Sequence, residues 1–263
     1  MYIAFFDSGL GGLNTLKRAV VDLPNEKYIY FGDTANVPYG IKSPDEVRTL
    51  MDRVLDYLSV YDLKAFVIAC NTATSAAAPV LRARHRFPII GMEPAIKPAV
   101  EECAANGQRV MLMATLLTLQ GEKIAGLKAK VDPDNLVDGL PCSELVEFAE
   151  RLEFDQKMVE AFLREKLADC DLTRYGCVVL GSTHLNYFRE AIANVFPTGT
   201  KIMDGNEGTV RHLAEVIHYD PRAEKPKDDR EILLHLSDST DQAKLELAAN
   251  LIREVTDAPV KLI

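Results

Sequence analysis

The sequence has no apolar run that approaches the ~20 residues of a membrane-spanning helix, although 48% of its 263 residues are hydrophobic. It also shows no secretory leader, since Met1 leads directly into the apolar residues 2–6 without a basic stretch or a small-residue cleavage site. We therefore expect a soluble protein of the cytoplasm, with no membrane partner. The chain is long enough to bury the cores of two domains of ordinary size.

Patterns for disulfides, metals and a common cofactor are missing as well. The five cysteines are odd in number and include no C-x-x-C pair, which favours reduced thiols over a zinc ribbon or a disulfide framework. Metal-ligand spacing is absent from His85, His212, His218 and His235. The placement of the lysines gives no support for pyridoxal phosphate, which needs a Schiff-base lysine. A formal net charge of −9 disfavours nucleic acid, so the expected ligand is a small molecule.

The most informative stretch that is present is an apolar strand pattern that ends at a cysteine. The apolar residues 65–69 stop at Cys70, Asn71 and Thr72, and such a run is typical of a parallel strand covered on both faces. Open α/β sheets bind ligands beyond the carboxyl ends of their strands. Cys70 is therefore a candidate site residue. The alternative is an inert core cysteine, since free cysteine is among the most buried residue types.

The same design recurs in the second half of the chain. Residues 67–72 align without gaps with residues 179–184, and residues 3–8 align with residues 110–115. This repeat predicts two similar α/β halves, although its period is far longer than that of a solenoid. Ser182 in the second half takes the place of Cys70 in the first. If the halves face one another, a substrate between them meets one of these side chains from each.

The rest of the chain alternates between strand and helix patterns. Strands are expected at residues 2–6, 28–31, 65–69, 88–92, 109–114, 177–181, 231–236 and 260–263, and residues 131–138 have both strand and turn character. Helices are expected at residues 13–20, 43–61, 73–84, 96–105, 142–150, 156–169, 209–216 and 240–256. A polar segment at residues 221–229 is expected to be a loop. We infer an α/β fold with largely parallel sheets, in which residues 1–92 plus 208–263 form the first domain and residues 93–207 the second.

Two loops of the first half contain candidate site residues. The glycine-rich residues 7–12 can present N–H groups to an anion at a helix N-terminus, but their spacing is neither the dinucleotide pattern nor a P-loop. The alternative is a tight turn with Asp7 as the helix N-cap. The loop at residues 32–40 is rich in turn formers and carries Tyr39, so we expect it to lie over the site. Within it, Asp33 is a candidate for substrate binding, but an Asx-turn is the favoured interpretation.

Four ordered motifs together resemble the glutamate racemases of the aspartate/glutamate racemase superfamily. They are Asp7-Ser8-Gly9-Leu10-Gly11-Gly12, Gly32-Asp33-Thr34 with Pro38-Tyr39-Gly40, Ala69-Cys70-Asn71-Thr72-Ala73, and Gly181-Ser182-Thr183-His184. The resemblance implies two α/β domains related by a pseudo-twofold axis, with the active site in the cleft between them. It also implies a cofactor-independent isomerase that interconverts L- and D-glutamate and supplies D-glutamate for peptidoglycan. The family commonly forms homodimers.

The resemblance further implies a role for each matching residue. Cys70 corresponds to the base that handles the α-proton of D-glutamate, and Asp7 to the carboxylate that orients it. On the opposite side, His184 corresponds to the family's histidine, and Glu150, rather than Glu147, to the glutamate of that side. The positions that match substrate-binding groups are Asp7, Ser8, Tyr39, Gly40, Asn71, Thr72, Thr183 and His184.

Ser182 departs from the family pattern, which has a second cysteine at this position. Inversion without a cofactor needs a base on one face of the α-carbon and an acid on the other, and a thiol with an ordinary pKa of ~8.5 can be either. A serine hydroxyl is far less acidic, so its presence predicts an impairment on the order of 10²–10⁴-fold. Leu185 and Asn186 replace the family's Tyr-Pro, which indicates further divergence on this side.

Two other functions stay open at this point. One is a divergent one-thiol enzyme, a decarboxylase or an isomerase of a related carboxylate, in which Cys70 alone protonates an enolate-like intermediate. The other is a catalytically weak protein that binds an amino acid or a partner. Incubation with single enantiomers of glutamate and aspartate discriminates between these alternatives and a racemase.

Overall fold

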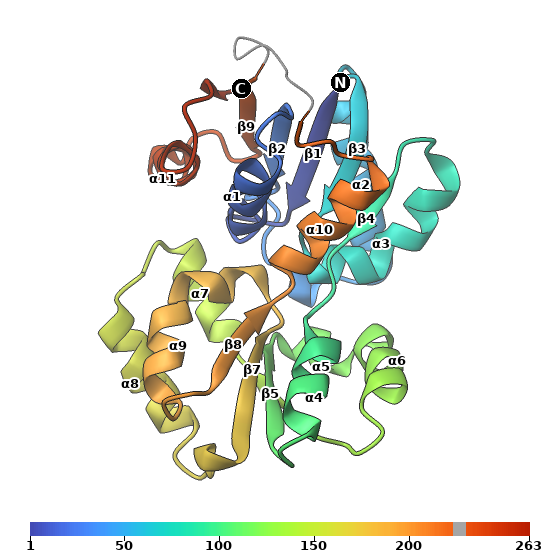
Figure 1. Cartoon of the computed structure of the whole chain (residues 1–263). Helices are drawn as coiled ribbons and strands as arrows, with labels where there is room; N and C mark the ends of the chain where they lie inside the picture. Colours follow the sequence, from blue (N-terminus) through green and yellow to red (C-terminus); the bar gives the residue numbers. More distant parts are fainter. Residues whose placement is uncertain (223–229) are drawn as a thin grey trace. The chain divides into compact units, whose positions relative to one another are not determined.

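The computed structural model describes residues 1–222 and 230–263, which form two compact units with one parallel sheet each (Figure 1). The first unit consists of Met1–Met92 and Asn206–Ile263, and the second of Glu93–Gly205. From residue 223 onward, the loop expected at residues 221–229 lies outside the described residues. No helix within the described ranges combines the length and the apolar character that a membrane crossing requires.

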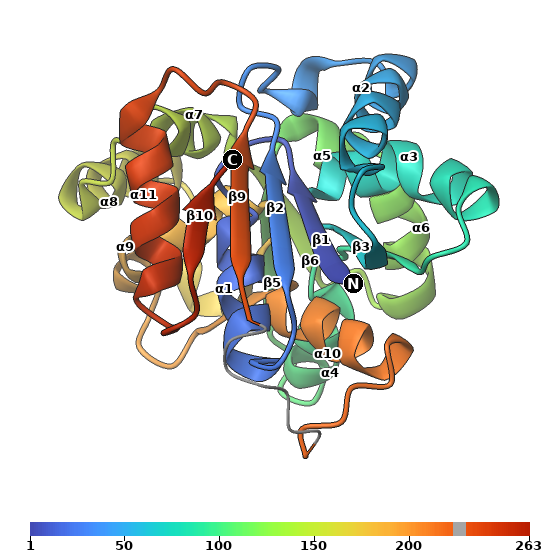
Figure 2. The same cartoon turned by 90° about the horizontal axis from the view of Figure 1, so that it is seen from above.

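The first unit is built on a six-stranded sheet in the order β10-β9-β2-β1-β3-β4 (Figure 2). Its strands are β1 (Tyr2–Asp7), β2 (Tyr28–Gly32), β3 (Leu63–Ile68), β4 (Ile89–Gly91), β9 (Ile232–Leu236) and β10 (Val260–Leu262). All pairs are parallel, and the central strands are buried on both faces, as their continuous apolar runs predict. Because β9 pairs with β2, the last part of the chain extends the sheet that the first part begins.

Helices cover both faces of this sheet (Figure 1). They are α1 (Leu13–Asp22), η1 (Tyr39–Ile41), α2 (Pro44–Leu58), α3 (Asn71–Arg84), α10 (Asn206–Val216) and α11 (Gln242–Arg253). On one face α2 packs against α3 over Phe6 and Phe66, and elsewhere α1 packs against α10 and α11. Helix α2 begins with Ser43 as its N-cap in a capping box and with Pro44 in its first turn.

The second unit has a four-stranded parallel sheet in the order β6-β5-β7-β8. Its strands are β5 (Arg109–Ala114), β6 (Val137–Pro141), β7 (Tyr175–Leu180) and β8 (Lys201–Asp204), and its helices are α4 (Ile96–Ala104), α5 (Leu116–Gln120), α6 (Glu122–Val131), α7 (Ser143–Glu150), α8 (Gln156–Lys166), η2 (Leu172–Arg174), η3 (Thr183–Phe188) and α9 (Arg189–Val195). On one face of the sheet α7, α8, η3 and α9 enclose a core around Phe188, and on the other α4 and α6 enclose a core around Cys103.

The two sheets share a common arrangement of four strands. The order β2-β1-β3-β4 in the first unit corresponds to β6-β5-β7-β8 in the second. Phe5 lies opposite Val67 in the first sheet, and Leu112 lies opposite Val179 in the second. These are the residues that the sequence alignment superimposes, and in both units the register shifts near the start of this strand pair. The prediction of two similar α/β halves is therefore confirmed.

The sequence prediction missed helix α6, which precedes and includes Val131. The strand and turn character expected at residues 131–138 is found as a turn followed by the first residues of β6, which begins at Val137. The carboxylate of Asp132 accepts hydrogen bonds from the backbone N–H groups of Leu136 and Val137, and this turn delays the strand. Helix α6 was missed because Ile124 is its one fully buried residue, so the segment has no apolar stripe.

Candidate active site

In the first unit, three adjacent strands end beside one another and deliver the predicted residues of that half. Strand β1 ends at Asp7, β2 ends immediately before Asp33, and β3 is followed by Ala69 and Cys70. Because these strands are parallel and adjacent in the sheet, their carboxyl ends meet at one edge. The structure thus brings Asp7, Ser8, Asp33 and Cys70 together.

The thiol of Cys70 is buried at the N-terminus of α3. Its Sγ lies 3.6 Å from Ser8 Oγ and accepts a hydrogen bond from the backbone N–H of Ala73 at 3.5 Å, so that Cys70 is the N-cap of the helix. Burial, followed by the charge of Asp7, raises the pKa of Cys70 to about 11, and the bonds to Ala73 and Ser8 oppose the rise. In the ligand-free protein the thiol form therefore dominates at neutral pH.

Asp7 is fully buried and holds the glycine-rich loop, but it does not cap a helix. Its Oδ2 accepts a hydrogen bond from the N–H of Gly9 at 3.0 Å, and the N-cap of α1 is Gly12. The alternative in which Asp7 caps the helix is therefore wrong. A Cβ atom at Gly12 would lie 2.5 Å from the Cβ of Asp7, so only glycine allows the loop to pass this close to β1. Tyr30 fixes the other side of the loop by donating to the carbonyl of Gly9.

Asp33 positions Tyr39. The hydroxyl of Tyr39 donates to Asp33 Oδ2 at 2.6 Å, and the side chain of Asn36 donates to Oδ1 at 2.9 Å. The expected Asx-turn at Asp33 is wrong, because both oxygens of the carboxylate serve other side chains of the loop. Burial and this hydrogen bond raise the pKa of Tyr39 well above its ordinary range, so its hydroxyl stays protonated. Gly40 follows in η1 and is half-buried.

The first turn of α3 carries Asn71 and Thr72. Asn71 is 9% exposed, and its Oδ1 has no hydrogen-bond partner among the described residues. A buried acceptor without a partner costs about 1–3 kcal/mol, so this atom is suited to accept from a bound ligand. Thr72 is half-buried beside it.

In the second unit, Ser182 stands where Cys70 stands in the first. It follows Gly181 after the end of β7, where a Cβ on Gly181 would lie 2.9 Å from the Cβ of Ala114 on β5. Ser182 is half-buried and is the N-cap of η3. Within the residues that the structure describes, its hydroxyl makes no hydrogen bond, in contrast to the Cys70 thiol.

Two buried polar residues, Thr183 and His184, come directly after Ser182. His184 is 3% exposed, and its Nε2 lies 2.6 Å from Oε1 of Glu150 at the end of α7. Glu147, one turn earlier, instead faces Arg151 at 3.7 Å. Of the two glutamates weighed from the sequence, Glu150 is the one in contact with His184. Because the carboxylate can only accept when ionised, the imidazole donates its Nε2–H and is fixed in orientation.

No other thiol of this unit substitutes for the missing cysteine. Cys170 is exposed and precedes the start of β7, whereas Ser182 follows the end of that strand. Cys142 follows β6, but it is 1% exposed in the core beneath α7, and burial raises its pKa to about 12. Cys177 and Cys103 lie in the core on the opposite face of the sheet. In the described part of the chain, no cluster of His, Cys, Asp and Glu side chains has the make-up of a metal site.

Two further residues of this unit, Gln156 and Arg189, hold the segment that carries His184. Their hydrogen bonds to η3 and its neighbours are described below. Neither residue could be identified from the sequence, because each is a polar side chain on a helix and bonds groups 13 to 35 residues away in the chain.

Comparison with known proteins places this arrangement among amino-acid racemases. A family model described as Asp/Glu/Hydantoin racemase matches residues 8–213. A glutamate racemase of Halothermothrix orenii is 41% identical over 255 residues, which are 97% of this chain and 100% of the relative. The structure resembles that of Escherichia coli glutamate racemase in complex with L-glutamate and the activator UDP-MurNAc-Ala, with a TM-score of 0.79 and 27% identity over 100% of this chain and 98% of the other. It also resembles that of Francisella tularensis glutamate racemase with D-glutamate, with a TM-score of 0.80 and 25% identity over 100% and 97% of the two chains.

The raised pKa of Cys70 predicts how this thiol ionises. The ultraviolet difference spectrum between the unsubstituted protein and Cys70→Ser should show thiolate appearing with a midpoint at pH about 11. The unfolded chain loses this proton first, near pH ~8.5, so ionisation of Cys70 favours unfolding as the pH rises from there towards the folded-state value. A midpoint at or below that of an ordinary thiol would show that the helix N-terminus and Ser8 outweigh burial.

Proposed function

Because this chain belongs to the Asp/Glu/hydantoin racemase family, we propose that it is a glutamate racemase that works without a cofactor and depends on a single thiol base. The observation that carries the proposal is the repeated sheet edge. One edge presents Cys70 beside Asp7 and Ser8, and the equivalent edge presents Ser182 beside the His184–Glu150 pair. Relatives with bound L-glutamate or D-glutamate support the choice of substrate.

Substrate binding in this proposal uses the polar residues that match the family's substrate-binding groups. The buried Oδ1 of Asn71 accepts from the ammonium group of glutamate, which relieves its lack of a partner. The N-terminus of α3 and the hydroxyls of Ser8, Thr72 and Thr183 donate to its carboxylates. The Tyr39 hydroxyl, which donates to Asp33, accepts from the ammonium group. Gly40 contributes its backbone next to Tyr39.

Proton transfer then begins at Cys70. Its thiolate takes the α-proton of D-glutamate, so that the C–H bond breaks, an S–H bond forms, and the electron pair passes into the α-carboxylate. The charge of Asp7, which opposes ionisation of the thiol in the ligand-free protein, is offset when the substrate ammonium enters. A proton delivered to the other face of the same carbon completes the inversion.

Ser182 is on the side that delivers this second proton. A hydroxyl is a far weaker acid than a thiol, and the loss of a general acid–base group typically costs about 10²–10⁴-fold in rate. We therefore propose that inversion is slow, and that the Ser182 hydroxyl and the His184–Glu150 pair supply what proton transfer remains. This same substitution favours the second candidate function, a one-thiol enzyme that acts on a related carboxylate.

The cellular role in this proposal is the supply of D-glutamate for peptidoglycan in the cytoplasm. Residues 1–92 with 208–263 and residues 93–207 act as two domains. A homodimer is the expected assembly, by analogy with the family.

The first test is incubation of the pure protein with single enantiomers of glutamate and aspartate. We expect slow inversion of glutamate, and in Ser182→Cys a gain on the order of 10²-fold, because the second face regains a thiol. Chiral chromatography over time measures both rates. No gain in Ser182→Cys would contradict the racemase proposal, and turnover of neither amino acid would favour the one-thiol alternative.

The second test uses deuterium oxide and separates the two faces. Cys70 should remove the proton of D-glutamate, exchange it with solvent and return a deuteron to the same face before the second side can act. D-Glutamate should therefore gain α-deuterium while keeping its configuration, and L-glutamate should exchange slowly. Proton NMR with chiral analysis measures exchange and inversion together.

Cys70→Ala is the control for this experiment. It should abolish exchange of D-glutamate while leaving binding largely intact, since the groups that hold the substrate are other residues. Exchange that survives Cys70→Ala, or equal exchange of both enantiomers in the unsubstituted protein, would show that the second side carries an effective base.

A further inference from the structure

The segment that carries His184 packs into the core of the second unit through Leu185 and Phe188, but its own backbone hydrogen bonds hold it only weakly. It is the 3₁₀ helix η3, and 3₁₀ turns have poorer hydrogen-bond geometry than α-helices. Ser182 gives η3 no side-chain cap, and the short helix α9 that follows has none at its N-cap Phe188. The orientation of His184 therefore depends on contacts from neighbouring elements.

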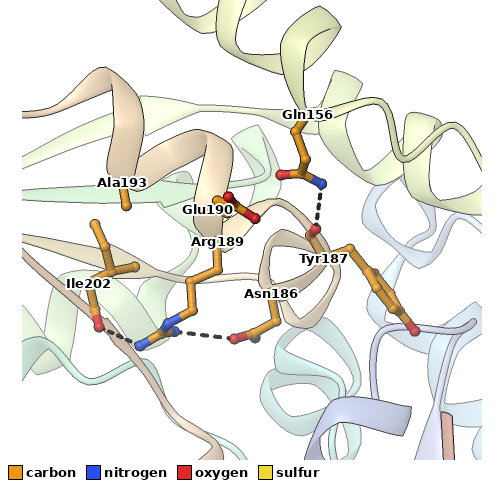
Figure 3. Close-up of a pocket in the computed structure, with 7 residues that line it drawn as sticks. All are labelled: Gln156, Asn186, Tyr187, Arg189, Glu190, Ala193 and Ile202. Carbon is orange, nitrogen blue, oxygen red and sulfur yellow. Dashed lines mark hydrogen bonds between the residues drawn. The ribbon is translucent and has the colours of Figure 1, made fainter.

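Gln156, the first residue of α8, supplies three of these contacts. Its Nε2 donates to the carbonyls of Phe154 and Tyr187, each at 3.1 Å, and its Oε1 accepts from the N–H of Ala191 at 3.1 Å. Figure 3 shows the bond from Gln156 to Tyr187. The N–H of Ala191 is in the first turn of α9 and has no partner within that helix. Gln156 thus caps α9 from another helix and ties down the end of η3.

Arg189 holds the same segment to strand β8. Its guanidinium donates to Oδ2 of Asp204 at 2.8 Å. It also donates to the carbonyl of Ile202 and, at 3.5 Å, to the side chain of Asn186, and Figure 3 shows these two bonds. Gln156 and Arg189 border a surface pocket of about 490 Å³. The lining of this pocket includes neither Ser182 nor His184, so we do not take it as the substrate site.

We propose that Gln156 and Arg189 are positioning residues for His184, a role that rests on the proposed function. The side chains fix η3 from two directions, and η3 packs against α7, which carries Glu150. The contact between His184 and Glu150 is 2.6 Å, so a displacement of η3 by ~1 Å breaks it. A misplacement of this size typically costs on the order of 10²-fold in rate.

The test compares two proton transfers in one sample. Gln156→Leu removes all three polar contacts at similar volume, and it should lower inversion by between about 10-fold and about 100-fold. Same-face exchange of D-glutamate, which depends on Cys70, should stay unchanged. Gln156→Glu keeps the acceptor for the N–H of Ala191 but loses both donors. Its rate of inversion should lie between those of the unsubstituted protein and Gln156→Leu. Because same-face exchange of D-glutamate also requires folded protein, its rate corrects the rate of inversion for the folded fraction. If exchange and inversion fall by the same factor, the role of Gln156 is merely structural and the proposal is overturned.

Asn194→Ala is the matched control for Gln156→Leu. Asn194 lies on α9 and donates to Glu160 on α8 at 2.8 Å, so it joins the same two helices without touching η3. Arg164→Met serves in the same way for Arg189→Met, because Arg164 donates to a carbonyl of α9 at 2.7 Å. Both controls should retain inversion. If the controls lose as much of the rate of inversion as Gln156→Leu and Arg189→Met do, the positioning role is wrong.

A second readout does not depend on glutamate turnover. The Nε2–H of His184, bonded to Glu150, should give a downfield ring N–H signal in ¹⁵N-edited NMR, assigned by its absence in His184→Gln. The signal should disappear in Gln156→Leu and persist in Asn194→Ala. If it persists in both, the positioning role is wrong. If the unsubstituted protein exchanges neither enantiomer, the proposed function fails, and this signal still decides whether Gln156 positions His184.

Discussion

The pairing of β1 with β3, repeated by β5 with β7, is the constraint on which the candidate site depends. In each unit this pair of parallel strands ends at one edge of a sheet, so the residues that directly follow the two strands lie at that edge. Asp7 and Cys70 meet for this reason in the first unit. Ser182 and His184 take the equivalent place in the second, with Glu150 reaching His184 from α7.

The burial that this placement imposes has different consequences on the two sides. Burial raises the pKa of the Cys70 thiol. The N–H of Ala73 and the hydroxyl of Ser8 lower this pKa and so favour the thiolate that takes a proton. On the other side, Ser182 has no such bonds within the described residues, so no hydrogen bond there stabilises the anion of its weakly acidic hydroxyl. The polar chemistry there is concentrated one turn away, in the bond between His184 and Glu150. The two sides therefore share a backbone and differ in the strength of their acid–base groups.

Features that follow from apolar patterning were predictable from the sequence. The runs before Cys70 and Ser182 predict buried strands, and their alignment predicts the register that pairs Phe5 with Val67 and Leu112 with Val179. Helix α6 was not predictable in this way, because it buries little apolar surface.

Contacts between polar side chains and distant backbone groups were also beyond the sequence. Nothing in the order of residues shows that Gln156 meets Tyr187 and Ala191. Such contacts arise only when helices that are separate in sequence come together. The candidate residues could therefore be named from motifs, and the groups that hold them in place could not.

The central claim is that the residue at the end of each repeated strand decides the chemistry of its face of the substrate. The most direct test exchanges the two groups in a Cys70→Ser/Ser182→Cys variant and follows α-proton exchange of each glutamate enantiomer in deuterium oxide. If the claim is right, the preference for D-glutamate reverses and L-glutamate exchanges with retained configuration. Exchange that still favours D-glutamate in this variant would contradict the account.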